Sequence, residues 1–244
     1  MITAQVSAEA GAAGSFVVSL TDVPDGAFLA WGLRSPDNET FTVTGVSDNI
    51  NGAWSLSGTL SGPVDDAGGT SRFYAGCFQD SAPSASLTIT IAFDATPASG
   101  HIIAAWFSSD VGDLTLQETT TPLYDGGSDA TPPSPTSTPS GSNGVYVGIV
   151  IGGGTRTVTA VGTDEVCPSS ASSQRCHVIY EPFTSGGSKS LEPTLSSASS
   201  RTSFHAFMVL EASAGTTMAP DRGALTLTGT ALRLGLTINM PDEL

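Results

Sequence analysis

The stretch from Ser86 to Phe107 constrains the fold more than any other part of the sequence. Its first segment, 86–93, alternates apolar with small or polar residues, which is typical of a β-strand with one buried face. After a turn at 94–100, the segment 101–107 is apolar at nearly every position, as in a strand that is covered on both faces. The pair predicts two strands, the second of them packed between neighbouring layers.

The composition favours the same class of fold. Hydrophobic residues make up 39% of the 244 residues, enough for a packed core, but charged residues make up only 13%, against about 25% in typical soluble domains. The polar surface must therefore come from Ser, Thr, Gly and Asn. A chain of this kind lacks the strongest helix formers and favours strands and turns.

The charge is strongly acidic, with 23 Asp and Glu residues against 8 Lys and Arg residues and a net charge of −15. This argues against nucleic acid and anionic membranes as partners, because both require a basic surface. No apolar run approaches the roughly 20 residues of a membrane-spanning helix, and the first ten residues do not have the pattern of a secretory signal. We therefore expect a protein that stays in the cytosol until it assembles with other subunits.

Further strands are predicted along the chain, interrupted by turns. One turn is Asn51-Gly52, a pair that tolerates positive φ and marks a tight hairpin. The oxygen-bearing residues beside it do not have the spacing of a calcium loop, so we interpret them as turn residues. The other predicted strands are 15–20, 27–33, 41–46, 71–78, 144–151, 176–183, 204–211, 222–229 and 231–239.

The second part of the chain repeats the first. Segments after residue 143 resemble earlier ones in the same order, which indicates an internal duplication. The corresponding pairs are 26–33 with 144–151, 41–46 with 156–161, 71–78 with 176–183, and 101–107 with 204–211.

Between the halves, residues 118–143 are rich in Pro, Ser and Thr, with five prolines from Pro122 to Pro139. Because proline lacks an N–H donor, we interpret this segment as a linker or as a long crossing between two sheets. The sequence thus predicts an all-β fold of two related, jelly-roll-like β-sandwich halves, 1–117 and 144–244, joined by the linker 118–143. It leaves open whether the halves form two lobes or one merged sandwich.

No catalytic or metal-binding constellation is found in the sequence, so we expect a protein that is not an enzyme and needs no cofactor. The histidines His101, His177 and His205 lie in apolar strands or beside a cysteine, where a structural role is commoner than catalysis, although a spatial triad is not visible in sequence. Cys167 and Cys176 could meet across a hairpin, but the odd number of cysteines favours unpaired thiols.

Two features are candidates for contact with a partner. Trp54 directly follows the predicted hairpin turn, where an exposed indole could stack on a sugar or a protein. The segment 231–239 alternates cleanly, and an amphipathic strand of this kind either closes an edge of its own sheet or adds to the sheet of a neighbouring subunit. Its apolar face is formed by Leu232, Leu234, Leu236 and Ile238.

Several of these segments together resemble structural proteins of tailed-bacteriophage virions. The resemblance lies in the order of 46–54, the aromatic strand around Phe73, the Thr-rich strand 86–93, the apolar 104–107, and the Gly223–Gly229 segment. It implies a non-enzymatic homo-oligomer that assembles in the bacterial host cytoplasm and contacts other virion proteins in the capsid or the tail. The acidic surface suits an exterior capsid decoration protein slightly better. The alternative is a lectin-like host-recognition module that binds glycan near Trp54.

Overall fold

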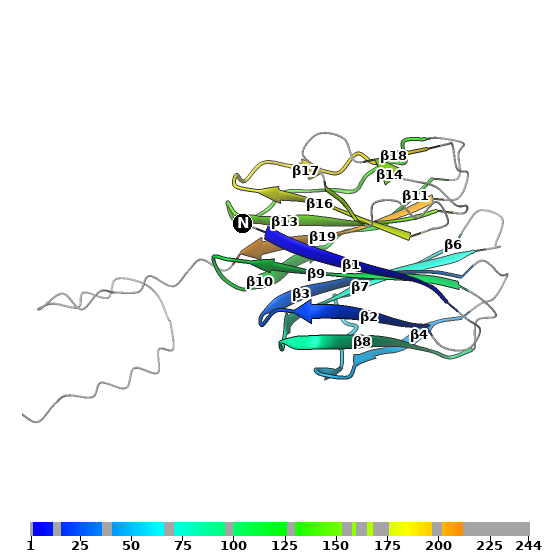
Figure 1. The fold of residues 1–244 in the computed structure, drawn as a ribbon. Coiled ribbons are helices and arrows are strands. Elements are labelled where there is room, and N and C mark those ends of the chain that lie inside the picture. The colour runs from blue at the N-terminus through cyan, green and yellow to red at the C-terminus, as the bar shows by residue number, and fades with distance from the viewer. Residues whose placement is uncertain are drawn as a thin grey trace, which may run out of the picture. The chain divides into compact units, whose positions relative to one another are not determined.

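The structure is a computed structural model that describes residues 2–11, 16–35, 41–65, 71–95, 100–125, 130–152, 158–159, 165–167, 176–196 and 202–211. All of them belong to one compact unit, Met1–Ser213. They form strands and turns, with no helix within these ranges (Figure 1). The all-β prediction is therefore confirmed.

Residues 2–109 form a first sandwich of two antiparallel sheets. The inner sheet has the strand order β1-β9-β3-β7-β6, and the outer sheet has the order β2-β8-β4-β5. The strands are β1 (Ile2–Gly11), β2 (Phe16–Val23), β3 (Ala27–Ser35), β4 (Val43–Asp48), β5 (Gly52–Ala53), β6 (Leu60–Asp65), β7 (Arg72–Ser81), β8 (Ser84–Phe93) and β9 (Gly100–Ser109).

Residues 114–211 form a second sandwich. Its inner sheet has the order β10-β19-β13-β16-β15, with β11 also paired to β19, and its outer layer consists of the short pairs β12–β17 and β14–β18. The strands are β10 (Leu114–Thr119), β11 (Leu123–Asp125), β12 (Thr136–Ser137), β13 (Gly144–Gly152), β14 (Val158–Thr159), β15 (Glu165–Cys167), β16 (Cys176–Phe183), β17 (Lys189–Ser190), β18 (Thr194–Leu195) and β19 (Thr202–Glu211).

The two sandwiches have the same connectivity. Across the first inner sheet the order is β1, β9, β3, β7 and β6, and these strands correspond in turn to β10, β19, β13, β16 and β15 of the second inner sheet. The corresponding strands also follow each other in the same order along the chain. The outer strands correspond as well, since β8 pairs with β2 and β4 as the β17–β18 segment pairs with β12 and β14. Chains that alternate between two sheets in this way form jelly rolls. The duplicated segments of the sequence thus occupy equivalent strands.

Three apolar clusters hold the layers together. The first lies between the outer and inner sheets of the first sandwich, the second between the two inner sheets, and the third between the second inner sheet and its outer layer. Figure 1 shows these layers stacked from β8 and β2 at one side to β17 and β18 at the other. The middle strands β3 and β13 are buried at every position because each lies in a sheet that is covered on both faces.

The two inner sheets pack closely against each other at Gly32 of β3. A Cβ atom at this position would lie 2.3 Å from Cγ2 of Ile149 on β13, which is far inside van der Waals contact. The same Cβ atom would also meet Cγ2 of Ile103 at 3.4 Å and Cδ1 of Ile151, on β13, at 3.6 Å. The described residues of the two sandwiches are therefore packed face to face and do not form two separate lobes.

The described residues of the predicted linker 118–143 are instead part of the second sandwich. β11 and β12 lie within it, and the hydroxyl of Tyr146 donates a hydrogen bond of 2.8 Å to the carbonyl of Pro135. Prolines are tolerated here because the outer layer needs only two short strand pairs. The connection between the sandwiches is the turn at residues 110–113, a few residues before the predicted boundary.

Candidate functional site

A buried polar cluster lies where the two sandwiches meet. Nδ1 of His205 is 2.9 Å from the hydroxyl of Ser61, and Nε2 is 2.7 Å from the hydroxyl of Ser203. His205 and Ser203 lie on β19 of the second sandwich, whereas Ser61 lies on β6 of the first. All three are buried. This cluster therefore links the two halves by hydrogen bonds across their interface.

The electrostatics of the cluster keep His205 neutral. Burial lowers the pKa of His205 from its ordinary value of 6.5 to about 3, because the imidazolium would lose its hydration. A neutral imidazole offers one donor and one acceptor, which match the two serine hydroxyls. Both ring nitrogens are thus engaged by serines, and neither contacts a carboxylate that would orient the ring for nucleophilic catalysis. The arrangement supports a structural role.

The other two histidines lie elsewhere in the sheets. His101 is on β9 and His177 is buried on β16. The thiol of Cys176 contacts the backbone carbonyl of His101 at 3.6 Å, so Cys176 packs between the inner sheets. Among the described residues, no group of His, Cys, Asp and Glu side chains is placed to hold a metal ion.

The predicted hairpin at Asn51-Gly52 is confirmed, and Asp48 organises it. One carboxylate oxygen of Asp48 accepts hydrogen bonds from the backbone N–H groups of Ile50 and Asn51, at 2.7 and 2.5 Å. The other accepts from the Asn51 amide at 2.9 Å and from the indole of Trp54 at 2.6 Å. Gly52 has φ of 78°, which glycine adopts without strain.

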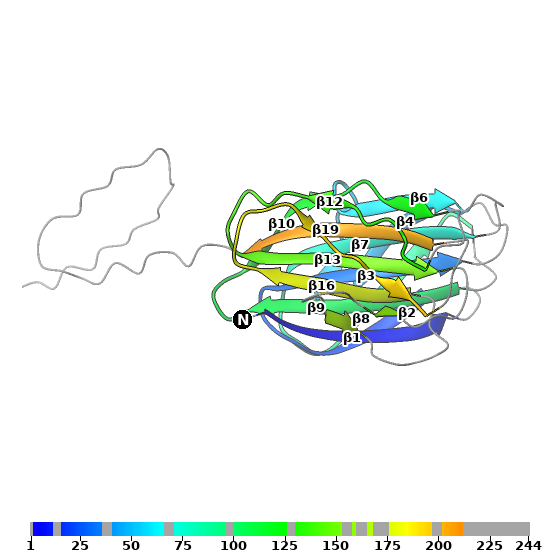
Figure 2. The same ribbon diagram turned by 90° about the horizontal axis from the view of Figure 1, so that it is seen from above.

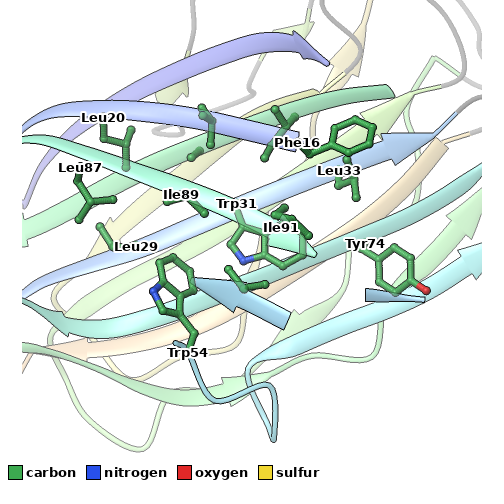
Figure 3. Close-up of a cluster of buried hydrophobic side chains, with 14 of the residues drawn as sticks. Phe16, Leu20, Leu29, Trp31, Leu33, Trp54, Tyr74, Leu87, Ile89 and Ile91 are labelled. Atoms are coloured by element: carbon green, nitrogen blue, oxygen red, sulfur yellow. The ribbon is translucent and has the colours of Figure 1, made fainter. Parts of the chain in front are cut away.

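The prediction that Trp54 is exposed for contact with a partner or a glycan is wrong. Its side chain is 6% exposed, and its ring stacks on Phe78 with 4.9 Å between centroids. Figure 3 shows the indole directed into the first cluster, toward residues such as Trp31. The ring can turn inward because Asp48 satisfies its N–H group. The Asp six residues earlier in the sequence is the signal that could have indicated this.

Replacing Asp48 with alanine is expected to destabilise the protein by about 2–4 kcal/mol, because the change leaves a buried indole N–H without its acceptor and removes the turn's contacts. Ile50→Ala is the matched control, since Ile50 is in the same turn and its side chain is 43% exposed. Urea denaturation of both variants measures the difference. Equal stability of the two variants would show that Asp48 does not organise the turn.

A surface pocket of about 380 Å³ lies on the outer layer of the second sandwich. Sequence reasoning missed it because its walls come from segments almost sixty residues apart. Three prolines give it apolar, rigid walls, and hydroxyls and one carboxylate give it polar groups. The lining residues are Thr131, Pro132, Pro133, Ser134, Ser190, Glu192 and Pro193.

The remaining candidates of the sequence lie partly outside the described residues. The alternating segment with Leu232, Leu234, Leu236 and Ile238 is outside them, as is the side chain of Cys167.

Asp65 forms an ion pair with Arg72, with 2.5 Å between Oδ1 and Nε, and Arg72 also donates to the carbonyl of Phe41 at 2.7 Å. The pair ties the start of β7 to β6 and to the segment before β4.

Comparison with known proteins gives no match to any family model, to any curated protein or to any solved structure. The described part of the chain also contains no helix that is long and apolar enough to cross a membrane.

Proposed function

We propose that the protein is a non-enzymatic structural component of a tailed-phage virion, a capsid decoration protein or a tail or neck accessory protein. The observation that supports this most is the face-to-face packing of two jelly rolls. The Gly32–Ile149 contact and the second apolar cluster fill the space between the inner sheets, so the described unit is a rigid block rather than two hinged lobes around a cleft.

The polar chemistry of the described interior also fits a building block. Ser61 and Ser203 both form hydrogen bonds with His205. Both carboxylate oxygens of Asp48 accept hydrogen bonds within its own hairpin. On the outer face of the first sandwich, hydroxyls such as Ser19 and Thr88 bond to each other. The exposed residues of β8 are Ala85, Ser86, Thr90 and Ala92, so this strand allows an acidic molecule to approach neighbouring subunits without charge repulsion.

Mass spectrometry of purified phage particles tests this proposal. The particles are prepared from a lysate of a strain that carries the coding sequence and are washed to remove adsorbed host protein. We expect the chain in the particles at a fixed ratio to the major capsid or tail protein. Its presence in the lysate together with its absence from intact particles would contradict the proposal.

The pocket on the second sandwich favours glycan binding as a second candidate function. Hydroxyls of Thr131 and Ser190 and the carboxylate of Glu192 can bond to sugar hydroxyls, while the prolines cover an apolar sugar face. On a glycan array we expect binding that Glu192→Ala abolishes and that the control Glu181→Ala, on β16, retains. An array without any signal for the wild-type chain would remove this candidate.

A further inference from the structure

β1 is an edge strand whose outer side has no strand partner among the described residues. It is the terminal strand of the first inner sheet and follows the margin of the ribbon in Figure 2. Ten consecutive residues pair with β9, from Ile2 opposite Ser109 to Gly11 opposite Gly100, without a register shift. An edge of this length without a bulge presents a row of unpaired N–H and C=O groups that another strand can bind.

The other edges of the inner sheets carry features that block strand addition. β6 contains Pro63 and a register shift between Ser61 and Val64, and proline offers no donor. β10 also has a register shift, and the backbone N–H of Leu116 is already bonded to the side chain of Gln79 at 3.0 Å. The described part of β15 is only three residues long.

The edges of the first outer sheet are blocked as well. On β2 the carbonyl of Thr21 accepts the indole N–H of Trp106 at 3.0 Å, and Asp22 has φ of 51°, which interrupts the extended backbone. At the opposite edge, β5 has two residues. Bulges, prolines and short edges are the devices by which proteins prevent unwanted pairing. β1 is the edge of the described sheets at which we find none of them.

We infer that β1 binds β1 of a second copy, antiparallel and about a two-fold axis. The first inner sheets of the two copies then become one continuous sheet across the dimer. The charge of the strand favours this partner. In a chain of net charge −15, residues 2–11 contain a single charged residue, Glu9. An axis near the centre of the strand places Glu9 of one copy opposite the start of the other strand, so the two Glu9 residues are not paired with each other.

This inference concerns the isolated protein in solution, and it holds whether or not the chain is a virion component. Light scattering during size-exclusion chromatography of the full chain is expected to give the dimer mass. A monomer at the highest soluble concentration would overturn the inference. It would do so even if the edge of β1 binds a strand of some other protein.

Two proline variants then locate the contact. Successive N–H groups of a strand point to opposite sides, so one of Gln5→Pro and Val6→Pro removes a bond to β9 and the other removes an outward donor. The variant with the outward change is expected to keep its circular dichroism spectrum and to elute at half the mass. A folded variant with the outward change that still elutes as a dimer would overturn the inference.

A cysteine scan remains decisive even where both proline variants unfold. Single cysteines at positions 3, 5, 6, 7 and 10 are introduced into a Cys167→Ser chain, in which the remaining native cysteines, Cys77 and Cys176, are buried. A two-fold axis brings only the central residues of β1 next to the same residues of the second copy. Oxidation is therefore expected to cross-link the variants at the centre of β1 and not the Thr3→Cys variant. Uniform cross-linking along the strand, or none, would overturn the inference.

Discussion

Gly32→Ala is expected to destabilise the protein by about 2–3 kcal/mol, the cost of overpacking a filled core. The added methyl group would lie 2.3 Å from Cγ2 of Ile149, which belongs to the other sandwich. Neither strand can move away easily, because β3 and β13 are buried at every position. The strain therefore acts on the interface between the two inner sheets, and chemical denaturation of the purified variant measures it.

A second substitution shows whether this strain arises from the interface. Ile149→Ala removes the contacted methyl group and alone is expected to cost about 2–5 kcal/mol. In the double variant the alanine at position 32 has room, so we expect a coupling energy of about 1–3 kcal/mol in the favourable direction. Additive effects would contradict the contact between the sandwiches.

Gly45→Ala is the matched control for this cycle. Gly45 also lies within a strand, but a Cβ atom there would meet only the Cβ of Ala92, at an ordinary 3.8 Å. Its stability is expected to change by less than about 1 kcal/mol, and in the stabilising direction if at all. A large loss of stability in Gly45→Ala would mean that any added Cβ atom in these strands is destabilising. The result for Gly32→Ala could then not be attributed to the contact with Ile149.

The stability of the protein is expected to fall by about 4–5 kcal/mol through His205 alone as the pH decreases from 6.5 to 3, at ~1.4 kcal/mol per pKa unit. The pKa of His205 is lowered to about 3 in the folded protein by burial, whereas the unfolded chain binds a proton near pH 6.5. Below that pH the unfolded state therefore binds more protons than the folded state. The stabilisation is complete above pH 6.5 and is lost as the pH falls.

Urea denaturation at pH 7 and at pH 4 tests this prediction with His205→Asn. The asparagine keeps a polar side chain but does not titrate, so the variant is less stable at pH 7 and less sensitive to acid than the wild type. His101→Asn serves as the control for the same change of residue type at a position that is only partly buried. An equal loss of stability in the wild type and in His205→Asn would contradict the role of His205.

Local strand and turn patterns could be predicted from the sequence. The alternation of 86–93 and the apolar run 101–107 correspond to β8 and β9, and Asn51-Gly52 forms its hairpin because glycine provides the positive φ. The duplicated segments also indicated the equivalence of β3 with β13, since 27–33 and 144–151 are both dense apolar runs. These features depend on neighbours that are close in sequence.

Contacts between distant residues could not be predicted in this way. Ser61 and His205 are 144 residues apart, and nothing local distinguishes a histidine in an apolar strand that meets a serine from one that does not. Trp54 shows the same limit, because a position beside a turn favours exposure until Asp48 supplies an acceptor inside the protein. The face-to-face packing also requires knowing which apolar strands share a layer.

Differential scanning calorimetry of the full chain tests most directly whether the two jelly rolls form one stacked unit. The shared cluster between their inner sheets predicts a single main transition in which the calorimetric enthalpy equals the van't Hoff enthalpy. Two separable transitions, with one of them reproduced by residues 1–112 produced alone, would show instead that the sandwiches fold and unfold as independent lobes.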